Sequence, residues 1–96
     1  MHFLVIEHFR NGDPIPIYQR FRDQGRMMPD GLAYVTSWIT EDLTRCYQVM
    51  ETAELRLLDE WLANWADLME FEVFPVLSSP AVRERLASRL SPPPNP

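Results

Sequence analysis

Five side chains in this sequence could act together on a small organic molecule. His8 lies near the end of an apolar run, and an imidazole there could serve as a general base near neutral pH. Tyr34 and Trp38 lie four positions apart in a second run, so in a strand they share a face and could stack on a flat aromatic substrate. Gln48 and Glu72 would add an amide and a carboxylate to that face. The set predicts an acid–base or binding site on one face of a sheet.

Each of these residues also has a purely structural interpretation. His8 could be hydrogen-bonded to backbone or water at a strand end, and Tyr34 with Trp38 could fill the core of a dimer. A desolvated Glu72 would have a raised pKa and could act as an acid, whereas at a sheet edge it would stay solvated. Glu7 points away from His8, and we expect it to pair with an arginine of the first helix.

Other kinds of chemistry find little support in the sequence. Cys46 is the only cysteine, and its separation from His2 and His8 lacks the compact spacing of metal ligands. We interpret Cys46 as a small buried hydrophobe. With three glycines in the chain and no glycine-rich phosphate loop, a dinucleotide site is not expected. Neither a metal nor a cofactor is therefore predicted.

Charge and composition restrict the partners. A net charge of −5 and a pI near 4.9 would repel phosphate backbones, so nucleic acid is not an expected partner. No apolar run approaches the 18 residues of a membrane span, and the first strand pattern leaves no room for a secretion signal. A single cysteine suits a reducing compartment. We therefore expect a cytoplasmic protein without membrane contact.

The elements follow one another with short links. Strand patterns cover residues 3–9, 32–39, 45–51 and 70–77, and helical periods cover 14–24 and 53–68. A last short helix follows Ser79-Pro80, with Val82, Leu86 and Leu90 on one side. We expect one domain over residues 1–90 and a disordered, proline-rich tail over residues 91–96.

The order βαββαβ is that of the ferredoxin-like fold, an α+β architecture. It predicts an antiparallel four-stranded sheet in the order 4-1-3-2, with both main helices on one face. We assign one apolar set of strand residues to the helix side: Phe3, Val5, Phe9, Ala33, Val35, Ile39, Val49, Phe71 and Val73. The opposite set mixes apolar and polar groups: Leu4, Ile6, His8, Tyr34, Thr36, Trp38, Cys46, Gln48, Met50, Glu70, Glu72 and Phe74. Such a mixture predicts a second copy over this face, with a cavity between the two copies.

Several segments together resemble a known family. They are Val5-Ile6-Glu7-His8-Phe9, Tyr18-Gln19-Arg20-Phe21-Arg22, Gly25 to Leu32, Tyr34-Val35, Ser37-Trp38, Arg45 to Glu51, Trp61 to Trp65, Asp67-Leu68 and Phe71-Glu72-Val73. Over roughly residues 3–78 the chain is similar to the small bacterial proteins of domain-of-unknown-function family 3303. The resemblance implies a dimeric α/β barrel, in which two ferredoxin-like sheets pack face to face. That group includes cofactor-free monooxygenases, muconolactone-type isomerases, haem-degrading enzymes and stress-associated proteins, and the family itself implies no assigned reaction.

The functional expectation is correspondingly general. We expect a homodimer that binds a small apolar or aromatic molecule, either between sheet and helices or at the dimer face. An alternative is a cofactor-independent enzyme, isomerase-like or monooxygenase-like, with His8 as acid/base and Tyr34, Trp38 and Gln48 positioning the substrate. A second alternative is a structural dimer without a ligand.

Overall fold

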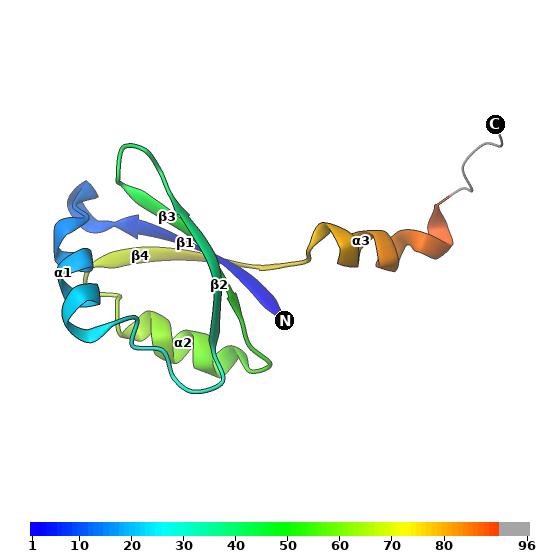
Figure 1. The fold of residues 1–96 in the computed structure, drawn as a ribbon, viewed down its shortest axis with the longest axis horizontal. Coiled ribbons are helices and arrows are strands. Elements are labelled where there is room, and N and C mark those ends of the chain that lie inside the picture. The colour runs from blue at the N-terminus through cyan, green and yellow to red at the C-terminus, as the bar shows by residue number, and fades with distance from the viewer. Residues whose placement is uncertain (91–96) are drawn as a thin grey trace.

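The structure, a computed structural model, describes residues 1–90; the predicted tail at 91–96 lies outside the described residues. Its strands are β1 (His2–Phe9), β2 (Ala33–Ile39), β3 (Arg45–Glu51) and β4 (Met69–Val76). They form one antiparallel sheet in the order β2-β3-β1-β4 (Figure 1). The predicted strands, sheet order and ferredoxin-like α+β fold are therefore confirmed.

Local signals set the limits of helix α1 (Ile15–Gln24), which follows a short 3₁₀ turn at Arg10–Gly12. The Asp13 side chain accepts a hydrogen bond from the Ile15 N–H at 3.0 Å, which satisfies one of the free donors of the first turn. Gly25 ends the helix with φ of 68°, a conformation that glycine adopts without strain.

Helix α2 (Leu55–Ala63) is shorter than predicted. The apolar period continues to Leu68, but the backbone leaves the α-helix after Ala63 and continues in tighter turns. The N–H groups of Asn64, Trp65 and Leu68 bond to carbonyls three residues earlier. This tight turn keeps Trp65 on the core side and brings the chain directly into β4.

Both helices pack on the same face of the sheet. Phe3, Val5 and Phe9 of β1 point into the core, where Ile17 of α1 meets them. From α2, Leu58 and Trp61 complete the cluster, and Leu58 is fully buried. The helices therefore cover one face of the sheet, as the right-handed crossovers require.

The register of β3 differs from our face assignment. Glu7 pairs with Cys46, Val5 with Gln48 and Phe3 with Met50, and directly paired residues point to the same face of a sheet. The three β3 residues are thus buried beneath the helices. Our placement of Cys46, Gln48 and Met50 on the face opposite the helices is wrong, and so is our placement of Val49 on the helix side, because Val49 lies on the face away from the helices.

A bulge in strand β2 places the side chains before and after it differently from our prediction. Its register shifts between Tyr34 and Thr36, which leaves Val35 as a bulged residue. Before the bulge Tyr34 pairs with Met50, so its ring lies on the helix side. After the bulge Trp38 pairs with Tyr47, on the other face. The expectation that Tyr34 and Trp38 share a face is therefore wrong.

The face away from the helices carries large apolar side chains among charged ones, and it is uncovered in the single chain. Trp38 is 76% exposed and Phe74 46% exposed on this side. Leu4, Ile6 and Val49 between them are half-buried. We call this surface the open face.

Helix α3 (Ser79–Leu86) and the 3₁₀ turn after it (Ala87–Arg89) lie beyond the end of the sheet, away from α1 and α2 (Figure 1). The Ser78 side chain caps α3 by accepting the Ala81 N–H at 3.2 Å. Neither element has a buried residue, and Val82 and Leu90 are exposed.

Candidate functional site

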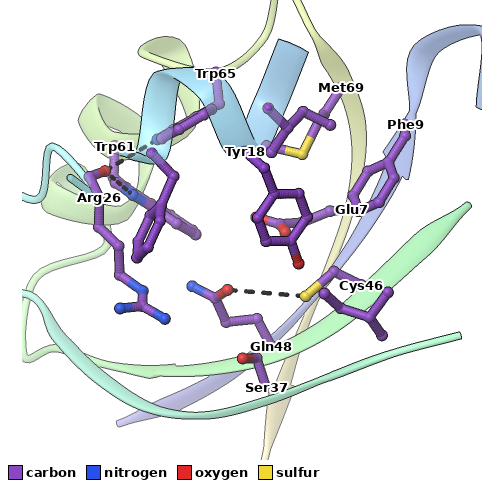
Figure 2. A pocket seen from close by; sticks show the side chains of 13 residues that line it. Glu7, Phe9, Tyr18, Arg26, Ser37, Cys46, Gln48, Trp61, Trp65 and Met69 are labelled. Atoms are coloured by element: carbon purple, nitrogen blue, oxygen red, sulfur yellow. Dashed lines mark hydrogen bonds between the residues drawn. The ribbon is translucent and has the colours of Figure 1, made fainter. Parts of the chain in front are cut away.

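A pocket of about 130 Å³ lies between the helix-facing side of the sheet and helices α1 and α2 (Figure 2). This is one of the two positions that the sequence suggested for a ligand. Aromatic and aliphatic side chains form most of its wall, with a few polar groups among them. The lining residues are Glu7, Phe9, Ile17, Tyr18, Phe21, Arg26, Ser37, Ile39, Cys46, Gln48, Trp61, Trp65 and Met69.

Glu7 is the buried carboxyl group of this pocket. It occupies a core-facing position of β1 and is 6% exposed. Burial raises its pKa from the ordinary 4.5 to about 7, because the charged carboxylate loses favourable contacts with water and the neutral acid loses fewer. Hydrogen bonding from the Cys46 thiol and the charge of Arg26 oppose this rise only in part. Near neutral pH the group can therefore hold or release a proton inside the pocket.

Cys46 and Gln48 extend this polar cluster along β3. The Cys46 sulfur lies 3.9 Å from the Gln48 side-chain oxygen, and the Gln48 amide donates to the Met50 sulfur at 3.1 Å. Burial, and then the charge of Glu7, raise the pKa of the Cys46 thiol to about 12. The thiol is therefore neutral at physiological pH and acts as a donor rather than a nucleophile.

Tyr18 brings a hydroxyl group to the pocket from α1. Burial raises its pKa, and the neighbouring Cys46 and Glu7 add to the rise. The phenol therefore stays protonated and is available as a hydrogen-bond donor. The side chain is 45% exposed, so it lies at the boundary between the pocket and solvent.

Arg26, just after α1, supplies the positive charge. Its backbone carbonyl accepts hydrogen bonds from the indole N–H groups of both Trp61 and Trp65, at 2.9 and 3.0 Å. Its guanidinium carbon lies 3.8 Å from the ring centre of Tyr34 and 5.0 Å from that of Phe21. The two indoles hold the Arg26 backbone in place, and the Tyr34 and Phe21 rings restrict the position of the Arg26 side chain. In Figure 2 this side chain lies beside Gln48.

The five residues singled out in the sequence fall on two faces. Gln48 lines the pocket, and Tyr34 contributes to it by stacking on Arg26. His8, Trp38 and Glu72 lie on the open face, on the other side of the sheet. A single cavity formed by all five is therefore ruled out within one chain.

On the open face the structure does bring together His8 and Glu72. Their Nε2 and Oε2 atoms are 2.7 Å apart, and both side chains are more than a third exposed. In the register Glu72 pairs with Ile6, so the bond to His8 runs diagonally across two strands. Trp38 lies on β2, and β3 separates that strand from β1, which carries His8.

Sequence reasoning missed Glu7 as a functional candidate. The expected pairing with an arginine of α1 is wrong, because Arg20 binds Asp67 at 2.7 Å and Arg22 binds Asp23 at 2.9 Å. The informative signal was present, since strand alternation places Glu7 between Val5 and Phe9, both assigned to the core. A carboxylate at a core position of a strand is a pocket candidate.

Within residues 1–90 no group of three histidine, cysteine, aspartate or glutamate side chains is close enough to hold a metal ion. In that range no helix has both the length and the apolar character needed to cross a membrane.

Comparison with known proteins gives one match. Neither the curated proteins nor the solved structures contain a significant match to this chain. The model of a family described as a domain of unknown function, DUF3303, matches residues 1–90, which are nearly the whole chain and include every strand and helix described above. The chain therefore belongs to the DUF3303 family.

Proposed function

We propose that this protein is a homodimer that binds a small apolar or aromatic molecule in the pocket between the sheet and helices α1 and α2. The observation that carries the proposal is the composition of the pocket wall. Two tryptophans, Trp61 and Trp65, form part of an apolar wall, and the Glu7, Tyr18 and Gln48 groups converge on the same space. A mostly apolar concave site with a few placed polar groups is the usual form of a ligand site.

The size of the pocket suits a small ligand. A cavity of roughly 150 Å³ binds benzene, and the pocket here, at about 130 Å³, is close to that size. A single aromatic ring is therefore the natural occupant. A reducing, cytoplasmic location suits Cys46, a free buried thiol in this wall.

The second chain of the proposed dimer covers the open face. Four strands of seven or eight residues present a face of about 500 Å² at standard strand spacing. Two such faces together bury about 1,000 Å², close to the roughly 1,200 Å² of a specific interface. Burial of Trp38 and Phe74, which lie on the two outer strands and are exposed in the single chain, adds apolar area on either side of the half-buried Leu4, Ile6 and Val49.

Ligand binding is tested by native mass spectrometry of the purified protein and by thermal shift with a panel of single-ring aromatic compounds. A ligand at 100 times its Kd stabilises the folded state by about 2.7 kcal/mol. Tyr18→Ala, in the pocket, should reduce this stabilisation, and Trp38→Ala, on the open face, should leave it unchanged. If no compound stabilises the protein and none copurifies, the ligand function is wrong and a structural dimer remains.

A second candidate function rests on the contact between His8 and Glu72. A carboxylate 2.7 Å from an imidazole can orient it as a general acid or base. Both residues lie on the open face, so a second chain packed there would enclose them. In this hypothesis the protein is a cofactor-independent enzyme. His8→Ala should then abolish turnover of the identified ligand while the melting temperature changes little, and unchanged turnover would exclude it.

A further inference from the structure

The Arg26 guanidinium is a positioned cation at the pocket. Among residues 1–90 the ion pairs of arginines involve Arg10, Arg20, Arg22 and Arg56, and none involves Arg26. The residue is half-buried and lines the pocket. Its N–H groups therefore have no carboxylate partner in the described part of the chain.

The rings beside Arg26 restrict how a ligand could reach it. The guanidinium carbon lies over the Tyr34 ring, 3.8 Å from its centre and within stacking distance, and it lies 5.0 Å from the centre of the Phe21 ring. Stacking of this kind leaves the N–H edge of the group free. A carboxylate binds that edge in the plane, through two parallel charge-assisted hydrogen bonds. In a half-buried site these bonds are stronger than in water.

The one carboxyl group in the pocket wall does not compete strongly for this cation. Glu7 lies beside Cys46 rather than in an ion pair with Arg26, and its burial favours the neutral form. As a neutral acid it is a hydrogen-bond donor, so it can tolerate an anionic ligand nearby. A neutral ligand would leave the Arg26 charge unpaired in a partly desolvated site.

We propose that the pocket is selective for a single-ring aromatic carboxylate, with the carboxylate on the Arg26 guanidinium and the ring against Trp61 and Trp65. This rests on the proposed function, because it names the ligand class of the same pocket. It adds charge selectivity, which a purely apolar pocket would lack.

Binding of such an anion should take up a proton. A second negative charge in the pocket raises the pKa of Glu7 above about 7, so affinity rises as pH falls. Three ionisable groups face Glu7: Cys46 from β3, Tyr18 from α1 and Arg26 just after α1. The other neighbours carry no charge: Trp61 of α2, Trp65 in the turn after α2, and Phe71 of β4. Of these, the thiol and the phenol have raised pKa values and do not titrate between pH 6 and 8.

The test uses benzoate and its neutral isostere benzamide on the full chain. The chain has three tryptophans, so its indole N–H signals in a nitrogen–proton correlation spectrum report on two places. Trp61 and Trp65 report on the pocket, and Trp38 reports on the open face. We expect benzoate to shift the first two signals and not the third, with an affinity about tenfold higher than that of benzamide at pH 6.

Two variants connect the selectivity to named groups. Arg26→Gln should remove the preference for benzoate, whereas Arg22→Gln, an exposed arginine paired with Asp23, should retain it. The backbone carbonyl of Arg26 is kept in Arg26→Gln, so unchanged indole signals of the free variant show that the fold is intact. For wild type, affinity for benzoate should fall about fivefold from pH 6 to 8 for a rise of one pKa unit on binding, and Glu7→Gln should abolish that dependence.

Equal affinities for benzoate and benzamide would overturn the charge selectivity and leave the pocket as an apolar site, as proposed above. Retained selectivity in Arg26→Gln would overturn the role of Arg26. A shift of the Trp38 signal alone would place the ligand on the open face and contradict both proposals. If neither compound shifts an indole signal, this inference is wrong, while the wider compound panel still decides the proposed function.

Discussion

Glu7 on β1 and Cys46 on β3 lie directly opposite each other in the sheet, and both face the pocket. The thiol has two acceptors nearby, the Glu7 carboxyl group and the Gln48 side-chain oxygen. The coupling acts differently on the two groups: the Glu7 charge raises the pKa of Cys46, whereas the thiol, by donating a hydrogen bond to the carboxylate, lowers the pKa of Glu7 and offsets part of its desolvation. Glu7 is therefore the member of the pair that titrates near neutrality, which makes the protein sensitive to pH.

The stability of the folded state should fall as pH rises through neutrality. The pKa of Glu7 is about 7 in the folded state against an ordinary value of 4.5, so the folded state binds more protons than the unfolded state between these values. The free energy of unfolding therefore decreases with rising pH in this window, by about 2–3 kcal/mol in total. Glu7→Gln mimics the neutral acid and should be more stable than wild type at pH 8. Urea unfolding at pH 5, 6, 7 and 8 measures this.

The control for this experiment is Glu41→Gln, which changes an exposed carboxylate in the link between β2 and β3. This variant should reproduce the wild-type dependence of the free energy of unfolding on pH, because an exposed carboxylate contributes little to the stability of the folded state. A Glu7→Gln variant that keeps the wild-type slope with pH would show that Glu7 is not the titrating group.

Cys46 should react slowly with thiol reagents. Only the thiolate is nucleophilic, and burial with the charge of Glu7 raises the pKa of Cys46 to about 12. Iodoacetamide at pH 8.5 should therefore label the protein slowly in buffer and quickly in urea. Glu7→Gln should label faster than wild type, since it removes the negative charge. Because that variant is expected to be more stable at this pH, faster unfolding could not explain the result. Equal rates in the two proteins would contradict the coupling.

The fold was predictable because its signals are local and repeated. A short run of branched and aromatic side chains defines β1, and the Asp13 cap and Gly25 define α1. Right-handed crossovers then place both helices on one face. The end of α2 was not predictable from period alone. The residues after Ala63 keep the apolar spacing in a tighter turn, so the side-chain pattern continues where the α-helix does not.

The site was harder to predict because the polar groups of the pocket conceal which face of the strand is buried. In β3, Cys46, Gln48 and Met50 look more polar than a core set, yet they are buried around a pocket that uses those polar atoms. The bulge at Val35 then reverses the alternation in β2 without any glycine or proline to announce it. Both errors concern the register between strands, which distant residues determine.

The open face should mediate dimerisation, and Trp38 is its most exposed residue at 76%. Trp38→Glu would bury an unpaired carboxylate in the proposed interface, which costs a few kcal/mol and should weaken the dimer about a hundredfold. Light scattering at micromolar concentration should then give a dimer for wild type and a monomer for the variant. Leu55→Glu, at an exposed position of α2, should remain dimeric. A monomeric wild type would refute the dimer.

Helix α3 should contribute to the dimer rather than to the fold of one chain. It has no buried residue; Val82 is exposed on it, and Leu90 is exposed just after the 3₁₀ turn that follows it. In a dimer those side chains could pack on the second chain and add to the area buried by the sheet, which alone falls somewhat short of a specific interface. A chain that ends at Ser78 should therefore lose only the α3 contribution to the helical circular dichroism signal, and should dissociate at a higher concentration than the full chain. Unchanged dissociation would assign α3 no role in assembly.

The two indole N–H groups on the Arg26 carbonyl should act as a unit. Trp61 and Trp65 donate to the same oxygen at 2.9 and 3.0 Å, so either one alone still satisfies it. Trp61→Phe or Trp65→Phe should each cost about 0.5–1.5 kcal/mol from the lost bond, besides the smaller ring. The double variant also leaves the carbonyl without its indole partners and releases the backbone that carries Arg26. The effect of the smaller rings is the same in the single and the double variants, so the double-mutant cycle cancels it. The double variant should lose about 0.5 kcal/mol or more of unfolding free energy beyond the sum of the two single variants. Urea denaturation at pH 6 measures all four proteins, and strictly additive free energies would show that the two tryptophans contribute independently and do not hold Arg26 in place together.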